Sequence, residues 1–315
     1  MDEAKFRMFR NRLMKVYRHL GRQANRLNVS CYRLYDHDLP EFPFCIDVYE
    51  NNIHVSEYKR RHGMSDIEHD GWIQGCLLLL CEVLEIKAEN IYLKLRRRKA
   101  GHRGQYQKFE NRKSEFIVQE NGLIFIVNLS DYLDTGLFFD HRITREMVRS
   151  ESAGKKLLNL FAYTGSFSVY AAEGGALEVT TVDLSKTYLS WAEKNMRLNG
   201  FSDASKYKYV QADVIQVLKT TPDSGFDLII LDPPTFSNSK RMTDTLDVQR
   251  DHVQLIHACL RILKPGGVLY FSTNYQKFIL EKEKIKCSSL QDITRQTTPF
   301  DFAGRLQRFC WRMEK

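Results

Sequence analysis

The sequence predicts an α/β protein whose second half folds as a doubly wound, mostly parallel sheet. From about residue 140, apolar strand candidates alternate with helices. The polar residues of this half gather where those strands end. The first half has shorter strands with hairpin signals and one long amphipathic helix. A small mixed α/β domain and an N-terminal helix are therefore expected to precede the larger sheet.

The chain divides into three predicted parts. Residues 1–33 form a basic helix, because apolar residues recur every three or four positions from Phe6 to Leu27. Residues 34–135 form a small α/β domain that we expect to bind RNA, and residues 136–315 form the larger domain. The expected elements of the small domain are a hairpin around Glu50-Asn51-Asn52, a helix over 72–84, a strand over 91–95 and a hairpin around Asn121-Gly122.

The larger domain is expected to contain strands at 156–161, 179–183, 207–211, 227–231 and 267–272. Between them, helices are expected over 166–173, 186–198, 214–219 and 245–263. Residues 292–297 and 308–313 are expected to add an antiparallel edge. In a sheet of this kind, ligands bind at the carboxyl ends of the strands.

Composition excludes several classes of protein. Of the 315 residues, 43% are hydrophobic and 27% are charged, which excludes a disordered chain. The longest apolar run, Gly75 to Cys81, is too short to span a bilayer, and the charged N-terminus has no apolar segment of a secretion signal. The seven cysteines form no CxxC pair, which predicts reduced, buried thiols and no metal site. We therefore expect a cytoplasmic protein without a membrane contact or an obligatory protein partner.

Positive charge is concentrated in two islands. Residues 1–33 carry nine Lys or Arg against two acids, and residues 94–113 carry nine against one. Two such islands favour a polyanion as partner, although solvated surface cations would give the same pattern. The second island leaves a predicted strand for a glycine-containing loop, and we expect it to bind RNA phosphates through Arg96, Arg97, Arg98, Lys99 and Arg103.

Four consecutive strand ends carry polar residues. The first strand ends in the run Asn159 to Ser166, and the next three end in Asp183, Asp213 and Asp232. The acid at the end of the second strand, Asp183, could simply cap the next helix. Polar residues at four consecutive strand ends predict a binding site at this edge of the sheet.

The first of these loops indicates which cofactor is bound. Dinucleotides need a G-x-G-x-x-G turn, but Tyr163 and Thr164 stand where two of those glycines would be. S-adenosylmethionine has no phosphate; it needs a close backbone approach for its amino-acid end and acceptors for its ribose hydroxyls and adenine amino group. Gly165, Asp183 and Asp213 offer these in chain order.

The run Asp232-Pro233-Pro234-Thr235 suggests a site for a planar base. Two consecutive prolines remove two N–H donors and leave rigid carbonyls beside a carboxylate. A base with N–H donors on its edge fits such acceptors, and Phe236 can stack on it. Alternatively, the prolines only end the strand.

Six stretches carry a family resemblance: Cys31 to Asp36, Asp131 to Phe138, Asp140 to Arg142, Asn159 to Ser166, Thr181 to Asp183 and Asp232 to Met242. On these, the sequence resembles the bacterial 23S ribosomal RNA methyltransferases of the class I S-adenosylmethionine fold. The closest likeness is to the guanine-N7 enzyme that forms the C-terminal half of a bifunctional large-subunit rRNA methylase. The family pattern has Asn where Thr273 stands and His just before the final Cys-Trp, where Arg308 and Phe309 stand. The guanine-N2 half is absent, so a free-standing version is expected.

The resemblance and the strand-end pattern together assign the site. The cofactor-binding residues are expected to be Asp140, Arg142, Asn159, Phe161, Tyr163, Thr164, Gly165, Asp183, Leu184, Asp213 and Asp232. The acceptor base is expected on Asp232, Pro233, Pro234 and Phe236, with Lys240 and Arg241 on RNA. For Asp140 and Arg142, a salt bridge at the domain junction is a competing interpretation.

The residues also bear on the chemistry. Carbon methylation of cytosine needs a cysteine nucleophile, and no cysteine follows a predicted strand of the site. Guanine N7 is already a nucleophile and needs only alignment with the methyl group. We therefore expect methylation of guanine N7 in 23S rRNA, either free or in a large-subunit assembly particle. The alternatives are methylation of an exocyclic base nitrogen and a non-catalytic RNA-binding assembly factor.

Overall fold

The computed structural model describes residues 3–58, 63–95, 115–132, 134–237, 245–305 and 308–315. Within them, the chain forms two compact units. One comprises Met1–Gly122 with Val127–Thr135, and the other comprises Leu123–Ile126 with Gly136–Lys315. No helix among these residues is both long enough and apolar enough to cross a membrane.

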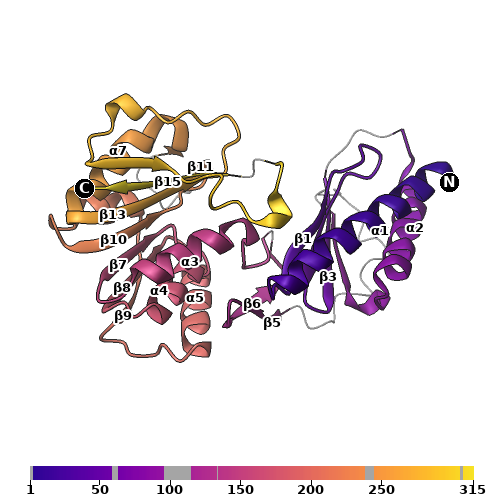
Figure 1. Cartoon of the computed structure of the whole chain (residues 1–315), viewed down its shortest axis with the longest axis horizontal. Coiled ribbons are helices and arrows are strands. Elements are labelled where there is room, and N and C mark those ends of the chain that lie inside the picture. Colours follow the sequence, from indigo (N-terminus) through magenta and orange to yellow (C-terminus); the bar gives the residue numbers. More distant parts are fainter. Residues whose placement is uncertain (1–2, 59–62, 96–114, 133, 238–244, 306–307) are drawn as a thin grey trace. The chain divides into compact units, whose positions relative to one another are not determined.

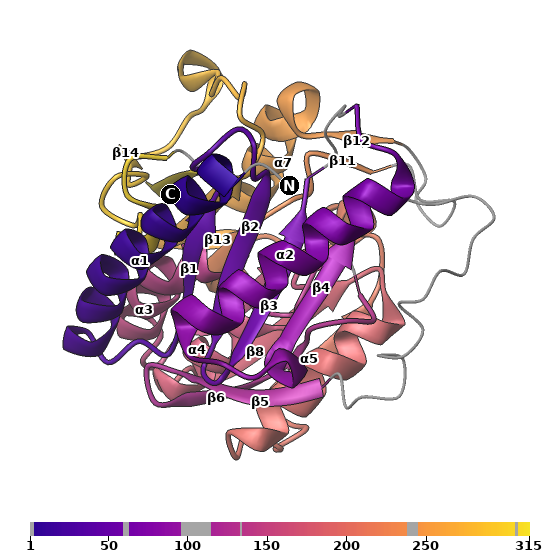
Figure 2. The ribbon, with the colours of Figure 1, turned by 90° about the vertical axis from the view of Figure 1, so that its right-hand side faces the viewer.

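The first unit is a four-stranded sheet with two helices on one face, as Figure 2 shows. Its elements are α1 (Glu3–Arg26), β1 (Cys31–Asp36), β2 (Phe44–Tyr49), β3 (Asn52–Glu57), α2 (Asp66–Leu84) and β4 (Ile91–Leu95). The strand order is β1-β2-β3-β4, and only β3 and β4 are parallel. A separate hairpin joins β5 (Glu115–Glu120) and β6 (Leu123–Asn128).

Helix α1 docks through the apolar stripe that the sequence predicts. Phe9, Leu13 and Val16 are buried. The Phe9 ring stacks on Phe42 with centroids 4.3 Å apart and meets Tyr35 edge-on at 5.5 Å. Such aromatic pairs stabilise packing beyond the area that they bury. The arginine-rich side of the helix is therefore left facing outward.

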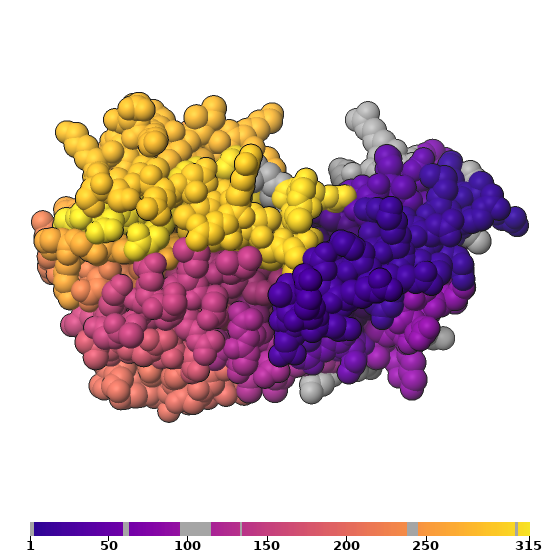
Figure 3. All heavy atoms as spheres, viewed as in Figure 1, coloured from indigo at the N-terminus to yellow at the C-terminus, as the bar shows by residue number. Residues whose placement is uncertain are grey.

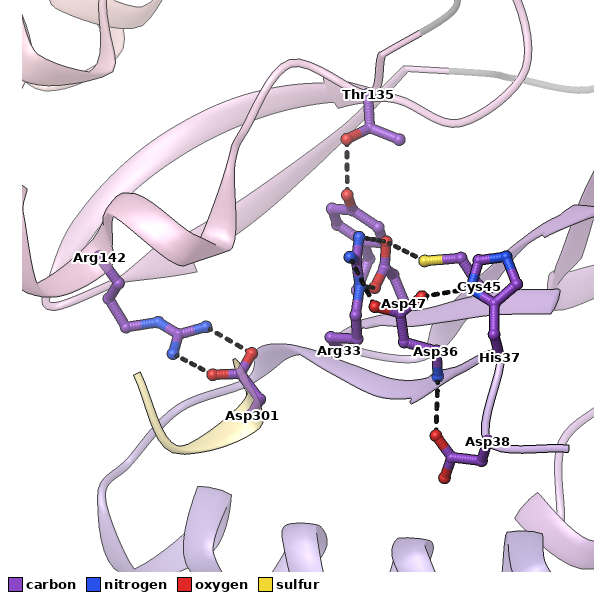
Figure 4. A network of polar contacts seen from close by, with 10 residues as sticks. Arg33, Asp36, His37, Asp38, Cys45, Asp47, Thr135, Arg142 and Asp301 are labelled. Atoms are coloured by element: carbon purple, nitrogen blue, oxygen red, sulfur yellow. Dashed lines mark hydrogen bonds and ion pairs between the residues drawn. The ribbon is translucent and has the colours of Figure 1, made fainter. Parts of the chain in front are cut away.

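A polar network lies on the strands of this unit (Figure 4). Arg33 donates from Nε to Asp47 Oδ1 at 2.9 Å, and the hydroxyls of Tyr49 and Thr135 are 2.5 Å apart. Burial, followed by repulsion from Asp47, raises the pKa of the Cys45 thiol beside this network. Five of the seven cysteines are buried and none forms a disulfide.

The second unit is built on a seven-stranded sheet; Figure 1 labels all of its strands except β14, which Figure 2 labels. They are β7 (Lys156–Leu160), β8 (Glu178–Asp183), β9 (Tyr207–Gln211), β10 (Phe226–Leu231), β13 (Leu263–Thr273), β14 (Ser289–Asp292) and β15 (Phe309–Glu314). The order is β14-β15-β13-β10-β7-β8-β9, with β13 to β9 parallel and β15 antiparallel to both its neighbours. The predicted doubly wound sheet is confirmed.

Helices cover both faces of this sheet. They are α3 (Arg142–Glu151), α4 (Ser166–Glu173), α5 (Lys186–Leu198), α6 (Val214–Thr220) and α7 (Val248–Ile262). On one face, α4 and α5 pack on the strands and α3 packs on α4. On the other, α6 and α7 contribute Leu218, Ile256 and Leu260 to a core cluster with strand residues such as Ile229 and Phe271. The strands buried between these layers place their carboxyl ends at one edge.

Two predicted elements differ from the structure. The last strand matches β15, but it lies between β13 and β14 and is not at the edge. The strand predicted over 292–297 is absent there: the edge strand β14 ends at Asp292. The chain turns after this residue, and the Thr297 hydroxyl donates to the Ile293 carbonyl at 2.8 Å. Helix α3 and the two-residue strands β11 (Phe236–Ser237) and β12 (Leu246–Asp247) were not predicted.

Candidate active site

The topology of the second unit marks one place for a ligand. The chain passes from β7 through β8 to β9 on one side and then returns to β10 on the other side of β7. The loops after β7 and β10 therefore leave the same edge in opposite directions. In open α/β sheets, ligands bind in the crevice at such a switch point.

The loop after β7 has an unusual backbone. Phe161, Tyr163 and Gly165 all have positive φ, at 53°, 52° and 71°. For residues with a side chain this conformation costs about 1–3 kcal/mol each, and it persists only where the surroundings hold it. At Gly165 an added Cβ would also lie 2.6 Å from the Cβ of Ala192. Gly165 is thus required by the packing of this loop against α5.

The surroundings of this loop supply several hydrogen bonds. The backbone N–H of Tyr163 donates to Asp183 Oδ2 at 2.9 Å. The Thr164 hydroxyl donates to the Gly136 carbonyl at 2.6 Å, and Asn195 Nδ2 donates to the Thr164 carbonyl at 2.9 Å. Thr164 is buried, so its side chain fixes the loop and is not exposed to a ligand.

Asp183 lies at the end of β8, beside this loop. Its Oδ1 accepts the backbone N–H of Ser185 at 2.8 Å, and Ser185, not Asp183, is the N-cap of α5. Burial raises the pKa of Asp183 above its ordinary value of 3.8, and the N–H groups of Ser185 and Tyr163 oppose that shift. The helix-capping alternative therefore does not describe Asp183. Asp213, by contrast, is the N-cap of α6, and its Oδ1 accepts the N–H of Ile215 at 2.9 Å.

Asp232, at the end of β10, is held from two sides. The Ser272 hydroxyl donates to its Oδ1 at 2.5 Å, and His141 Nε2 lies 3.4 Å from its Oδ2. Its side chain is 30% exposed, so the carboxylate is both oriented and accessible. Pro233 is buried and Pro234 is exposed.

Phe236 follows in β11 and is 57% exposed. This short strand pairs with β12 through Phe236 and Asp247, which fixes its backbone. A large exposed ring on a fixed strand can stack on a planar ligand. The role expected for Phe236 stays a prediction.

His141 contacts Asp232 but was not among the expected site residues, although it lies within the run Asp140 to Arg142 that carries part of the family resemblance. The ring is buried and meets Phe167 edge-on at 5.5 Å. Burial lowers the pKa of His141 below its ordinary value of 6.5, more than the nearby Asp232 raises it. A neutral imidazole is therefore expected next to Asp232 at neutral pH.

Asp140 and Arg142 have protein partners. Arg142 Nη1 lies 3.1 Å from Asp301 Oδ1, and Figure 4 shows this contact. The Asp301 side chain is fully buried. The Asp140 carbonyl accepts from Arg308 Nη2 at 2.8 Å. Arg308 Nε also lies 3.7 Å from Asp140 Oδ2, so both residues form salt bridges. All the partners lie in the second unit, so neither bridge is the one expected at the domain junction. A role for either residue at the cofactor stays a prediction.

The two positions that depart from the family pattern are both buried. Arg308 also donates to the Thr144 hydroxyl at 2.9 Å and the Thr297 carbonyl at 3.0 Å. It therefore ties α3 to the segment before β15. Thr273 ends β13 and accepts the Tyr275 N–H at 3.3 Å.

Comparison with known proteins identifies the family of this chain. A family model described as S-adenosylmethionine-dependent methyltransferase matches residues 85–306. The chain belongs to this family. The fold class, the cofactor and the enzyme class expected from the sequence are thereby confirmed.

The relatives agree with this assignment. The methyltransferase is 46% identical to the ribosomal RNA large subunit methyltransferase K of Neisseria meningitidis, over 97% of this chain and 86% of that protein. It is 47% identical to the ribosomal RNA large subunit methyltransferase K/L of Magnetococcus marinus, over 97% of this chain but 42% of that protein. These matches confirm the resemblance noted in the sequence.

Among solved structures, the methyltransferase is similar to the crystal structure of the methyltransferase SMU.776 complexed with SAH. The TM-score is 0.75 and the identity 26%, over 97% of this chain and 82% of that one.

The residues at the carboxyl edge fit S-adenosylmethionine. The cofactor supplies a methyl group on a sulfonium, and its ribose and adenine present O–H and N–H donors. An ionised carboxylate has about four lone-pair sites, more than the backbone N–H groups around Asp183 occupy. Asp183 can therefore hold the loop and a ribose diol together. The individual roles of Asp183, Leu184 and Asp213 stay predictions.

Asn159, the next-to-last residue of β7, is hydrogen-bonded within the protein, and seven other expected residues lie outside the described residues. Asn159 is buried and donates to the Ser168 hydroxyl at 3.0 Å, which in turn contacts the Thr181 hydroxyl at 2.8 Å. In this structure Asn159 joins β7 to α4 and β8. The expected RNA-binding residues outside the described residues are Arg96, Arg97, Arg98, Lys99, Arg103, Lys240 and Arg241.

Proposed function

We propose that this methyltransferase transfers a methyl group from S-adenosylmethionine to N7 of a guanine in 23S rRNA, in the cytoplasm. The observation that carries the proposal is the oriented, accessible carboxylate of Asp232, followed in the same loop by the exposed ring of Phe236. The names of the Neisseria and Magnetococcus relatives support large-subunit rRNA as the substrate.

The site suits a reaction that needs alignment and charge stabilisation. When the methyl group moves from sulfur to N7, the positive charge moves from the sulfonium to the purine. A carboxylate already oriented by Ser272 and His141 stabilises that charge as it develops. N7 carries no proton, so no base has to remove one. Holding the two reactants in line supplies the remaining rate enhancement.

The cysteines support nitrogen methylation over carbon methylation. A carbon methylase of the cytosine type needs a thiolate in the site. Cys310, on β15, is buried, and burial raises the pKa of its thiol to about 11. Burial also raises the thiol pKa of Cys45, Cys76 and Cys259. These thiols stay protonated and make poor nucleophiles.

Access to N7 requires an unpaired or everted guanine. In A-form RNA the N7 edge faces a deep, narrow groove that side chains do not reach. Turning the base outward costs a few kcal/mol, and stacking on Phe236 offsets part of that cost. Alanine substitution at a base-stacking aromatic costs about 1–3 kcal/mol, so Phe236→Ala should lower kcat/KM for RNA by about 5- to 150-fold.

The decisive experiment follows labelled methyl groups from S-adenosylmethionine into 23S rRNA and identifies the product by nucleoside chromatography. We expect 7-methylguanosine from the wild-type protein, loss of product with Asp232→Asn, reduced product with Phe236→Ala and near-normal product with Phe236→Tyr. Label in an exocyclic-nitrogen product would overturn the N7 assignment. No transfer to rRNA would overturn the substrate.

A further inference from the structure

Helix α1 carries two sets of basic residues that differ in their partners. Arg10 pairs with Glu82 at 2.7 Å, and Arg12 pairs with Asp38 at 2.6 Å. Further along the helix lie the exposed residues Lys15, Arg18, Arg22 and Arg26. In the part of the chain that the structure describes, none of these four has an ion-pair partner. We call these four residues the α1 stripe.

The members of the α1 stripe share one side of the helix. They follow one another at steps of three, four and four residues, which are neighbouring positions on a helix surface. From Lys15 to Arg26 the stripe extends for about 16 Å, at a rise of about 1.5 Å per residue. Asn11 and Gln23 line the same shallow groove and add polar groups to it. The result is a continuous row of cations and hydrogen-bonding groups.

The orientation of the stripe is fixed by the packing of α1. Phe9, Leu13, Val16 and Ala24 are buried on the opposite side of the helix. The helix therefore cannot rotate without exposing this apolar face. Figures 2 and 3 show α1 at the surface of its unit.

The charge pattern is not the one that solubility alone requires. Solvated helices usually alternate acids and bases, so that neighbours attract each other. No Asp or Glu occurs between Ala4 and Tyr35. Like charges three and four positions apart repel each other and weaken the helix. The α1 stripe thus carries an uncompensated repulsion that a bound polyanion relieves.

We propose that the α1 stripe binds the phosphate backbone of the RNA substrate. This inference rests on the proposed function, which gives the protein an RNA substrate. Arg guanidinium groups bind phosphate through two parallel N–H donors, and amide side chains add contacts to phosphate and sugar oxygens. Such contacts position the RNA without reading its sequence.

The test compares two double variants of the full chain that remove equal charge. Arg18→Gln with Arg22→Gln removes two cations from the α1 stripe. Lys282→Gln with Lys286→Gln removes two exposed cations from the second unit. Binding to a labelled 23S rRNA transcript is measured over a salt series, together with S-adenosylmethionine affinity and thermal unfolding of each protein.

We expect the α1 double variant, but not the control variant, to bind RNA at least about tenfold more weakly than the wild-type protein at 0.1 M salt. The slope of log K for RNA binding against log salt concentration should become less steep by about 1.5. Its S-adenosylmethionine affinity should be unchanged and its melting temperature equal or higher, because repulsion is removed. A loss of folding would give a lower melting temperature instead.

Equal slopes for both variants would overturn the inference while rRNA methylation by the wild-type protein still stands. Weaker binding to vesicles of anionic lipid, with unchanged RNA binding, would assign the stripe to a membrane surface and overturn it too. If the wild-type protein methylates no rRNA, the proposed function fails by its own assay.

Discussion

Asp183 offers the sharpest test of the cofactor site. Its two oxygens accept the backbone N–H groups of Tyr163 at 2.9 Å and Ser185 at 2.8 Å. The substitution Asp183→Asn keeps one acceptor oxygen but turns an NH2 group toward one of these donors. The variant must therefore lose either a hydrogen bond to the loop backbone, such as the one from the N–H of Tyr163, or a hydrogen bond to the ribose diol.

The expected loss of S-adenosylmethionine affinity follows from the hydrogen bonds that the substitution removes. A hydrogen bond to a charged group contributes about 1.5–3 kcal/mol. The loss of one such bond, with some displacement of the loop, should weaken S-adenosylmethionine binding by about 2–4 kcal/mol, or about 30- to 700-fold in Kd.

Titration calorimetry with S-adenosylmethionine measures this effect. The control is Asp203→Asn, which removes the same charge from an exposed carboxylate that accepts the N–H of Ser205 at 2.9 Å. Wild-type affinity in a folded Asp183→Asn protein would refute the assignment of the ribose site.

The pH dependence of stability provides a second check on Asp183. Its pKa is raised above 3.8 in the folded state, so the folded protein holds this proton more tightly than the unfolded chain. The wild-type protein should therefore lose stability relative to Asp183→Asn as the pH rises from about 3.8 through the raised value. Urea unfolding of both proteins over this range measures the difference.

Three further predictions concern the framework of the site. Gly136→Ala should cost about 2–4 kcal/mol in urea unfolding, because φ is +107° and a Cβ would lie 2.5 Å from the Trp191 ring. Arg142→Leu should cost about 3–5 kcal/mol, because it removes the positive charge that lies 3.1 Å from the buried Asp301 carboxylate. Because the pKa of His141 is lowered in the folded state, the unfolded chain binds the proton more tightly than the folded protein. The wild-type protein should therefore become less stable as the pH drops below about 6.5, and His141→Gln should reduce this loss of stability.

Each of these predictions has a matched comparison. Gly200→Ala also has a positive φ, of +84°, but open space around it, and should cost only about 1–2 kcal/mol. Arg142→Leu combined with Asp301→Leu should cost less than Arg142→Leu alone. Equal losses within either pair, or the same pH slope in His141→Gln as in the wild-type protein, would contradict the reasoning.

The parallel strands were predictable because they alternate with helices along the chain and most of them are short, largely apolar segments that end in a polar residue. Asp183 and Asp232 mark the ends of two such runs, and the topology brings both to one edge. The cofactor followed from the bulky Tyr163 where a dinucleotide site would need glycine.

What escaped prediction depends on long-range contacts. Helix α3 was missed because its buried face includes Arg145, which donates to the Phe138 carbonyl at 2.9 Å and lies over the Tyr170 ring. In the sequence, such an arginine looks like a surface residue. His141 gains its meaning only from Asp232, which lies far along the chain. The ion pair of Arg142 with Asp301 could not be predicted either, because the two residues lie far apart in the sequence.

The position of β15 has a consequence for how the protein is made. Residues 309–314 form an inner strand, with β13 on one side and β14 on the other. A ribosome synthesises these residues after every other strand of the sheet. Until they emerge, β14 has no neighbour to pair with, and the Trp311 ring that stacks on Phe271 is missing from the core. A nascent chain that stalls before residue 309 should therefore expose an unpaired strand edge, which makes it a target for chaperones and proteases.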